Sequence, residues 1–471
     1  MTITPCERAT MKGRDVVICA LVLALISGSC TPALAASRGD EAVQPRPSSV
    51  RARALAVLPS NPYYFQDALR RPVVLMGDYT WGTFSDLDFD YVRFLDSLHS
   101  RGLNTARAWL WWGCEEITTD PIPARHVEPF LRPGPGTAND GRPKYDLSRF
   151  NSVFFERLQA FCRAAQQRSI QLQLIMMDAW MLKHAELWKL HAFQRDNNIN
   201  GVDGDPAHTG TGIDGARGFC SLGNPGAMKY QEALVRKIVE TINGFSNVRY
   251  EIANENYYSA EWELALCDFI HEIEKTMPRK HLTMRRDLPL HSDVVQRWEP
   301  ALVRRGMLAR RVLRQPLIFD TDWTINKNDD EVRAAMWTAL LSGGHFDYMD
   351  DALEYRLGKP SQDPRAALHK QIDFAAAFMK RIKPWEMTPD DALVRSGTAY
   401  AMASSAQLAA YLPRGGRVLL DLSRMGGSLQ AQWYNPRGGS FGESFGVDGG
   451  QPREFKAPDE DDWGLLLQRR P

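Results

Sequence analysis

The chain has 471 residues, and its 57 basic and 57 acidic side chains give a formal net charge of zero. This length allows one large domain and a small one. The balanced charge, without a basic patch or a basic amphipathic helix, argues against nucleic acid or a membrane surface as a partner. The 13 Trp, 20 Phe and 14 Tyr residues could supply stacking platforms for sugars, although most aromatic side chains lie in protein cores.

Residues 1–35 have the pattern of a secretory signal peptide. Lys12 and Arg14 precede an apolar run at 16–26 that is too short to span a bilayer, and residues 33–35 offer small side chains for cleavage. We therefore expect an exported protein, periplasmic or secreted, without an integral membrane segment after cleavage. Cys30 also allows a lipoprotein interpretation, which is disfavoured because no aliphatic residue stands three positions before it.

Residues 36–57 are polar and contain proline, which predicts a flexible leader. From residue 58 to residue 388, apolar strands alternate with amphipathic helices, a pattern typical of a parallel α/β sheet or barrel. The expected strands are 73–76, 104–112, 171–177, 250–255, 281–284, 293–295, 317–322 and 346–350, of which the fifth and sixth have the weakest signals. This order predicts an α/β fold, a (β/α)₈ TIM barrel.

Two further regions depart from the strand–helix pattern. Segments 113–146 and 181–224 are long and polar, and loops of this length in a compact domain are usually functional. Residues 389–471 consist of short alternating runs separated by Gly and Pro, which predicts a small antiparallel β-sandwich.

The most informative stretch runs from Tyr250 to Glu255. It is typical of a buried strand that ends in the pair Asn254 and Glu255. Side chains from several strand ends converge on one face of a barrel, so Glu255 would face a cleft there instead of bulk solvent, the commonest surroundings of a glutamate. A general acid also needs partial burial or a negative neighbour to keep its proton. We predict that Glu255 is catalytic and that Asn254 lies in the same cleft.

A second carboxylate should come from the seventh strand, across the barrel. Asp320 and Asp322 lie two residues apart and therefore point the same way in an extended strand. Asp322 is nearer the mouth and ranks slightly ahead as the nucleophile, while the other aspartate could cap the next segment or pair with Arg107. Arg107 is a lone charge in an apolar strand and must meet a carboxylate. Two roles fit Arg107 equally well: it could orient the nucleophile, or it could form a purely structural ion pair.

Other polar and aromatic residues at predicted strand ends and in the long loop could hold sugar hydroxyls or stack on sugar rings. They are Asp78, Trp81, Trp111, Asp178, Trp180, His191 and Asn198. The scattered cysteines show no metal-ligand spacing. We therefore expect a monomer that binds a carbohydrate and needs no metal or cofactor.

Six motifs in chain order resemble a known family. They are Asn61–Phe65, Gly77–Trp81, Asn104–Arg107, Tyr250–Glu255, Asp320–Asp322 and Trp433–Arg437. Residues 58–471 resemble the apiosidase-like family of glycoside hydrolases, clan A barrels followed by a β domain named "putative collagen-binding domain of collagenase". The resemblance implies a retaining barrel with the acid/base role on Glu255, as clan A acid/base residues directly follow an asparagine on the fourth strand.

One feature departs from the clan, whose nucleophile is usually a glutamate on strand seven. Only aspartates stand there in this chain, and the shorter side chain leaves an inverting mechanism open. The sequence thus predicts an exported glycoside hydrolase that cleaves O-glycosidic bonds in a polysaccharide or branched glycan. The alternative hypothesis is a non-catalytic carbohydrate- or matrix-binding protein on a degenerate barrel. The C-terminal segment is expected to pack on the barrel, with Trp433 and Trp463 inward, and not to bind collagen or sugar on its own.

Overall fold

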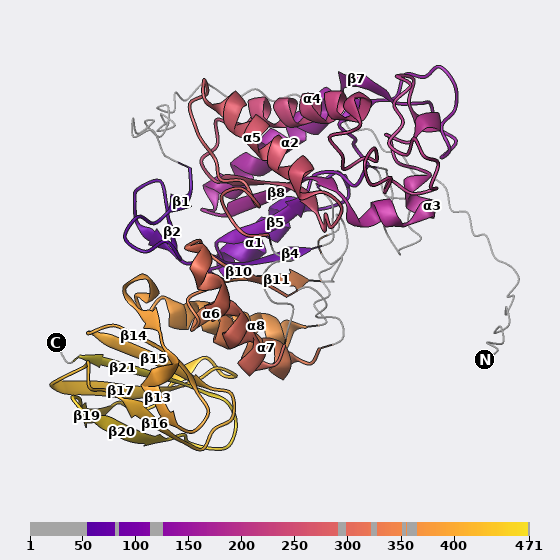
Figure 1. The fold of residues 1–471 in the computed structure, drawn as a ribbon. Helices are drawn as coiled ribbons and strands as arrows, with labels where there is room; N and C mark the ends of the chain where they lie inside the picture. The colour runs from indigo at the N-terminus through magenta and orange to yellow at the C-terminus, as the bar shows by residue number, and fades with distance from the viewer. Residues whose placement is uncertain are drawn as a thin grey trace, which may run out of the picture. The chain divides into compact units, whose positions relative to one another are not determined.

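The computed structural model describes residues 54–80, 84–113, 126–290, 298–321, 327–350, 355 and 365–469 (Figure 1). The predicted signal peptide, most of the predicted leader, Trp81, Asp322 and the expected sixth strand lie outside the described residues. Within the described ranges, each helix is too short or too polar to span a bilayer.

A curled parallel sheet forms the centre of the structure. Its six strands follow the order β10-β11-β4-β5-β8-β9. They are β4 (Met76–Thr80), β5 (Thr105–Trp109), β8 (Gln171–Asp178), β9 (Val248–Asn254), β10 (Ile318–Asp320) and β11 (His345–Asp350). These are the expected strands one to four, seven and eight. The prediction of an α/β fold with a parallel sheet is therefore confirmed.

The first strand begins later than predicted. The apolar run at 73–76 was expected to be the strand, but the parallel pairing starts at Met76. Val73 belongs instead to a small antiparallel sheet made of β1 (Ala56–Val57), β2 (Phe65–Gln66) and β3 (Pro72–Val73). The apolar run 73–76 does not reveal that Val73 pairs with β2 while Met76 pairs with β11, so the sequence could not show where the parallel strand begins.

The expected fifth strand is reduced to a single bridge. Thr283 pairs in parallel with Tyr250 of β9, through backbone bonds at Leu282 and Met284. The backbone N–H of Thr283 points to the side away from β9, where the Asp287 carboxylate accepts it at 2.7 Å. Among the described strands, the sheet therefore forms half of a barrel, with edges at β9 and β10.

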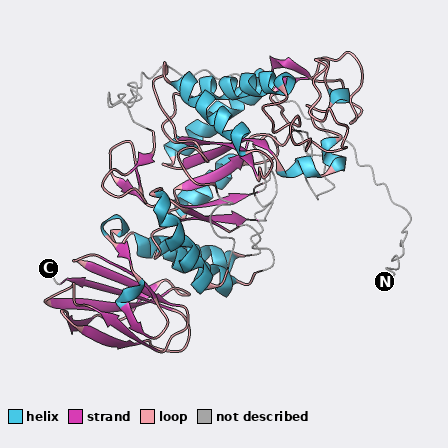
Figure 2. Ribbon diagram, viewed as in Figure 1, coloured by secondary structure: helices cyan, strands magenta, loops and turns pink. Residues whose placement is uncertain are grey.

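Amphipathic helices surround the sheet (Figure 2). They are α1 (Tyr91–Ser100), α2 (Ser152–Gln167), α4 (Pro225–Ile242), α5 (Ala260–Glu274), α6 (Pro300–Arg310), α7 (Asp329–Leu340) and α8 (Ala366–Met379). Polar side chains cap several starts: Asn151, Asn224, Ser259 and Asn328 each accept a backbone N–H from the first turn of the helix that follows. One face of α2, which includes Phe154, Leu158 and Phe161, is buried in the main hydrophobic core.

The C-terminal segment forms two antiparallel sheets, drawn almost entirely as strands in Figure 2. The larger sheet has the order β12-β14-β15-β21-β17-β18, with β19 paired to β17, and the smaller has the order β13-β16-β20. The strands are β12 (Thr388–Pro389), β13 (Val394–Ser396), β14 (Tyr400–Ala403), β15 (Gln407–Leu412), β16 (Arg417–Asp421), β17 (Ser428–Asn435), β18 (Ser440–Phe441), β19 (Phe445–Asp448), β20 (Pro452–Lys456) and β21 (Trp463–Arg469). Both sheets contribute to one hydrophobic cluster, in which Trp433 and Trp463 are buried as predicted.

The other face of the larger sheet belongs to the main core. Tyr411 of β15 stacks on Trp337 of α7 with ring centroids 5.5 Å apart, and Tyr434 of β17 packs against Trp337 and Phe378 of α8. Alternate residues of one strand therefore face different cores, because successive side chains point to opposite sides of a sheet. The C-terminal sheets are thus packed on α7 and α8.

Candidate active site

Glu255 directly follows the last residue of β9 and has a left-handed backbone conformation, with φ of 48°. A residue other than glycine seldom adopts this conformation, and such strained residues cluster at functional sites. Its side chain is 23% exposed, so its carboxyl is partly shielded and still reachable from solvent.

The surroundings of Glu255 favour a proton on its carboxyl. Burial raises the pKa of Glu255, and the Asp320 carboxylate raises it further. Lys183 lowers it, with Nζ 3.8 Å from Oε2, and Arg107 lowers it as well. The net shift is upward, which is the direction that a general acid requires.

Asp320 ends β10 and is the second carboxylate of the site. The Tyr79 hydroxyl donates to Oδ1 at 2.5 Å, and Arg107 Nη1 lies 3.7 Å from Oδ2. The carboxyl is almost fully buried, and both neighbours stabilise negative charge on it. Arg107, which lies beside Asp320, also donates to Asn254, the residue directly before Glu255, so strands four and seven meet at this guanidinium.

Arg107 of β5 connects this pair to the interior of the sheet. It donates to Glu251 from Nε at 3.0 Å and from Nη2 at 2.7 Å, and Nη2 also donates to Asn254 Oδ1 at 2.9 Å. Burial alone would lower the pKa of Arg107, but Glu251 and Asp320 raise it well above its usual value. Arg107 thus forms a buried ion pair with Glu251 and lies 3.7 Å from Asp320, an arrangement compatible with both interpretations drawn from the sequence.

Glu251 is the residue that the sequence analysis missed. It accepts Gln173 Nε2 at 2.7 Å in addition to Arg107, and Gln173 Oε1 in turn accepts Arg249 Nε at 2.8 Å. A lone acidic residue inside an apolar strand was the available signal, of the same kind that singled out Arg107. This polar network fixes the position of Arg107 and thereby the donors that reach Asp320 and Asn254.

Asp178, at the end of β8, orients Asn254. Asn254 Nδ2 donates to Asp178 Oδ1 at 3.1 Å, and Trp109 Nε1 and the Met181 backbone N–H donate to the same carboxyl at 3.3 and 2.9 Å. Burial raises the pKa of Asp178 to about 7 despite these donors. The Asn254 amide is held at both ends, because its oxygen accepts Arg107 and its nitrogen donates to Asp178.

Trp180, one of the aromatic residues predicted to bind sugar, lies near Glu255. It is half-buried, and its ring lies 5.3 Å from Lys183 Nζ, which is 3.8 Å from Glu255 Oε2. Tyr257, two residues after Glu255, is 63% exposed.

The structure places Asp78 outside this group. It lies between Gly77 and Tyr79 on β4 and points to the helix layer, where Arg101 Nη1 donates to it at 2.9 Å and His369 of α8 lies 3.9 Å away. The alternation of side chains along a strand explains this placement, because Tyr79 points to Asp320. Asp78 therefore stabilises the packing of helices on the sheet.

Trp111, His191 and Asn198 are also placed away from a solvent-reachable site, because each is buried: His191 and Asn198 within segment 181–224, and Trp111 against His191, with ring centroids 5.9 Å apart. His191 stacks on Trp188 at 4.9 Å, and burial lowers its pKa to about 3. Asn198 Nδ2 donates to three backbone carbonyls, and its Oδ1 accepts the Val202 N–H at 2.9 Å. These side chains shape segment 181–224 from within, so their role is structural.

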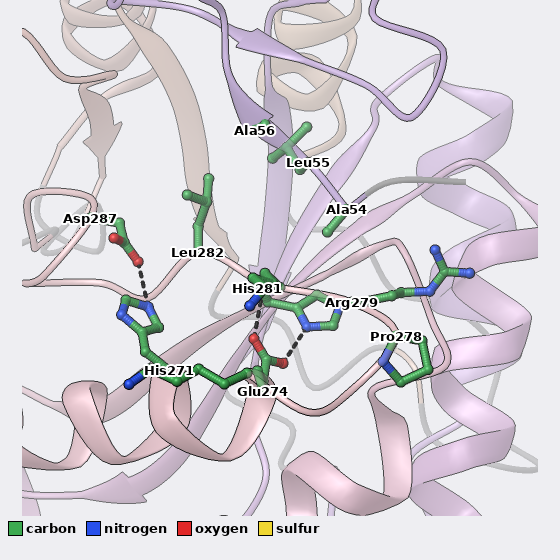
Figure 3. Close-up of a pocket in the computed structure, with 12 residues that line it drawn as sticks. Ala54, Leu55, Ala56, His271, Glu274, Pro278, Arg279, His281, Leu282 and Asp287 are labelled. Carbon is green, nitrogen blue, oxygen red and sulfur yellow. Dashed lines mark hydrogen bonds and ion pairs between the residues drawn. The ribbon is translucent and has the colours of Figure 1, made fainter. Parts of the chain in front are cut away.

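A cavity of about 840 Å³ lies at the far end of α5 (Figure 3). Helix α5 starts just after Glu255, and its 15 residues span roughly 22 Å, so this cavity is remote from the carboxylates. Its buried His281 already uses both ring nitrogens, 2.6 Å from Glu274 Oε1 and 2.8 Å from the Phe245 carbonyl, and His271 pairs with Asp287 at 3.0 Å. These groups stabilise the fold and leave the strand ends as the better candidate for chemistry.

Two family models match parts of the chain. "Domain of unknown function (DUF6298)" matches residues 117–284, and "Putative collagen-binding domain of a collagenase" matches residues 389–468. The second match confirms the resemblance of the C-terminal segment, whereas the apiosidase-like resemblance of the barrel stays a prediction. No curated protein matches the sequence.

Solved structures of glycoside hydrolases have a similar fold. A glycoside hydrolase family 5 protein from Bacteroides vulgatus is 16% identical with a TM-score of 0.60, over 88% of this chain and 93% of its own. A "putative glycoside hydrolase" from the same organism is 14% identical with a TM-score of 0.62, over 89% of this chain and 83% of its own. The chain therefore has a glycoside-hydrolase-like α/β fold.

Proposed function

We propose that this protein is an exported glycoside hydrolase acting on a polysaccharide or branched glycan. One observation carries the proposal. Arg107 links the ends of strands four and seven, because its guanidinium lies 3.7 Å from Asp320 Oδ2 and donates at 2.9 Å to Asn254, the residue directly before Glu255. Glycoside hydrolysis needs a pair of carboxyl groups, with one protonated and the other charged. The fold shared with glycoside hydrolases supports the same conclusion.

In the proposed mechanism, Glu255 donates its proton to the glycosidic oxygen as the bond to the leaving sugar breaks. Asp320 either attacks the anomeric carbon or removes a proton from the water that does so. Arg107 and Tyr79 hold Asp320 in place, and the fixed Asn254 amide lies beside the reacting sugar. Asp322, two residues further along and slightly preferred as the nucleophile from the sequence, lies outside the described residues and stays a candidate for the same role. No step calls for a metal or an organic cofactor.

The remaining predictions from the sequence belong to the same proposal. We propose that residues 1–35 direct export, that the sheet closes into a full (β/α)₈ barrel over residues 58–388, and that residues 389–471 form a β-sandwich. A monomer suffices for this chemistry, because both carboxylates and their neighbours come from one chain.

The test is hydrolysis of a panel of plant and microbial glycans, with products identified by chromatography. Glu255→Gln should lower turnover on the best substrate by roughly 10²–10⁴-fold, the usual contribution of a general acid. Glu261→Gln is the matched control, because Glu261 is exposed on the first turn of α5 and should leave turnover unchanged. Wild-type turnover by Glu255→Gln would remove Glu255 from its role. Glycan binding by the wild type without any hydrolysis would favour the binding-protein hypothesis.

A further inference from the structure

A second cavity, of about 890 Å³, lies between the barrel helices and the C-terminal segment. Residues 298–302 at the start of α6 and residues 327–334 at the start of α7 form its barrel side. Residues 398, 400 and 413–415 of the C-terminal segment form the opposite side. The two parts of the chain thus build one cavity together.

This cavity lies on the catalytic face of the sheet. Strand β10 ends at Asp320, and α7 begins at Asp329, so the start of α7 is on the side where the strand carboxyl ends meet. Trp298 also packs edge-on against Phe319, the neighbour of Asp320 in β10, with ring centroids 6.2 Å apart. Because side chains alternate along a strand, Phe319 points away from Asp320, so the cavity lies on the helix side of β10. A glycan chain that extends from the strand ends over the start of α7 would reach it.

Two aromatic side chains, Trp298 and Tyr400, give the cavity apolar ring surface together with an indole N–H and a hydroxyl group. Trp298 and Tyr400 are both half-buried. Within the described part of the chain, neither the Trp298 indole N–H nor the Tyr400 hydroxyl forms a hydrogen bond. An aromatic ring with an available donor matches a sugar, which has an apolar ring face and a hydroxyl rim.

The charges around the cavity select among sugars. Three carboxylates line it, from Glu299, Asp330 and Glu331, against the two cations of Lys327 and Arg414. Lys327 Nζ pairs with Glu331 at 3.3 Å, and Arg333 Nη1 pairs with Asp330 at 2.8 Å. The charges around the cavity therefore nearly cancel, so it offers no excess of positive charge to hold an anionic sugar such as a uronate, whereas a neutral sugar would find both donors and acceptors.

We propose that this cavity binds a neutral saccharide unit of a glycan chain, as a distal subsite built jointly by α6, α7 and the C-terminal segment. The inference rests on the proposed function for the identity of the ligand, because the chain bound here would be the chain cleaved at Glu255. It also assigns the C-terminal segment a part in binding that the isolated segment could not perform.

Isothermal titration with the Glu255→Gln protein tests the subsite without turnover. The probes are the β-1,4-linked hexasaccharides of glucose, mannose and xylose, with hexagalacturonate as the anionic comparison. Ala301→Trp fills the cavity from an exposed position on α6, and Ala309→Trp adds the same side chain to the exposed end of that helix outside the cavity. We expect a neutral hexasaccharide to bind, with affinity lowered about tenfold or more by Ala301→Trp and unchanged by Ala309→Trp.

Unchanged affinity in Ala301→Trp would overturn the subsite, as would the absence of binding by all three neutral hexasaccharides or equal binding of hexagalacturonate. Melting temperatures of the two variants should agree, which separates blocking from unfolding. If the wild type hydrolyses none of the probes but Ala301→Trp still weakens binding, the subsite stands and the proposed catalysis falls. If the wild type hydrolyses a hexasaccharide that Ala301→Trp binds equally well, the catalysis stands and the subsite falls.

Discussion

At the scale of single residues, the candidate site consists of charges that are fixed by other side chains. Arg107 touches Asp320 and Asn254 only because Glu251 holds it with two hydrogen bonds. Asn254 keeps one orientation because Arg107 and Asp178 bind its two ends. Groups fixed in this way need no rearrangement as charge develops on a substrate. The network therefore suits catalysis, although a buried ion pair alone is weak evidence for stability.

Lys183 offers a test of the Glu255 pKa. Its cation favours the charged form of Glu255 and so lowers that pKa. Catalysis needs the protonated acid, so activity should fall as the pH rises through the pKa of Glu255. In Lys183→Met this pKa rises, and the basic limb of the kcat/KM profile should move to higher pH. The exposed Lys189→Met is the control, and an unmoved or downward-shifted limb in Lys183→Met would contradict the assignment of Glu255 as the acid.

Glu251→Gln tests the role of the interior network. The amide keeps the shape and one acceptor, but it removes the charge that pairs with Arg107. We expect kcat to fall roughly tenfold or more with little change in KM, because Glu251 acts through Arg107 on a fixed site and does not touch substrate. A change in KM alone would indicate that Glu251 affects binding of the glycan instead.

At the scale of elements, close packing between β4 and β5 holds together the strands that carry the candidate site. Gly77 of β4 pairs with Thr105 of β5, and a Cβ at residue 77 would lie 2.3 Å from both the Thr105 backbone oxygen and Cγ2. Only glycine allows this approach, which brings Tyr79 and Arg107 onto neighbouring strands near Asp320. The site depends on this strand pairing as much as on its own side chains.

Gly77→Ala should therefore destabilise the fold. Overpacking of this kind costs about 1–3 kcal/mol or more, and here backbone atoms must move. The free energy of unfolding in urea should fall by that amount, whereas Gly244→Ala should be nearly neutral because nothing lies within 4 Å of its Cβ position. Equal stabilities of the two variants would show that β4 and β5 are less closely packed than described.

Element order was largely predictable from sequence, whereas side-chain direction was not. The run from Tyr250 to Glu255 identified β9 and its end, because an apolar run that stops at polar residues is typical of a buried strand that reaches the mouth of a barrel. Asp78 was predicted to face the substrate, whereas it points to the helix layer. The start of its strand was misplaced in the prediction, and with it the assignment of which side chains point inward. The buried position of Asn198 could not be predicted, because its backbone partners come together only after segment 181–224 has folded.

At the scale of the whole molecule, the C-terminal segment completes the hydrophobic core that covers α7 and α8. Trp337 and Phe378 are buried, and the rings of Tyr411 and Tyr434 lie against them. Arg333 of α7 donates to both oxygens of Asp462 at 2.8 and 2.9 Å, and the Tyr411 hydroxyl donates to the same carboxyl. Deletion of residues 389–471 would expose this surface, and we expect lower solubility and a lower melting temperature of the truncated barrel.

Asp462→Ala tests this contact without a deletion. Removing one partner of a buried ion pair costs about 3–5 kcal/mol, and the cost should lie near the lower value because Arg333 also pairs with Asp330. Asp461→Ala is the matched control, since the Asp461 side chain is 71% exposed. A melting temperature of Asp462→Ala equal to that of Asp461→Ala would contradict the docking described here.

The central claim is that Glu255 and Asp320 act as one catalytic pair, and a double-mutant cycle tests it most directly. The measurement is kcat on the best glycan of the panel for the wild type, Glu255→Gln, Asp320→Asn and the double variant. Residues that act as a unit are strongly non-additive, so each single variant should lose roughly 10²-fold or more and the double variant should be hardly slower than either. Wild-type turnover by Asp320→Asn, or losses that multiply in the double variant, would contradict the account.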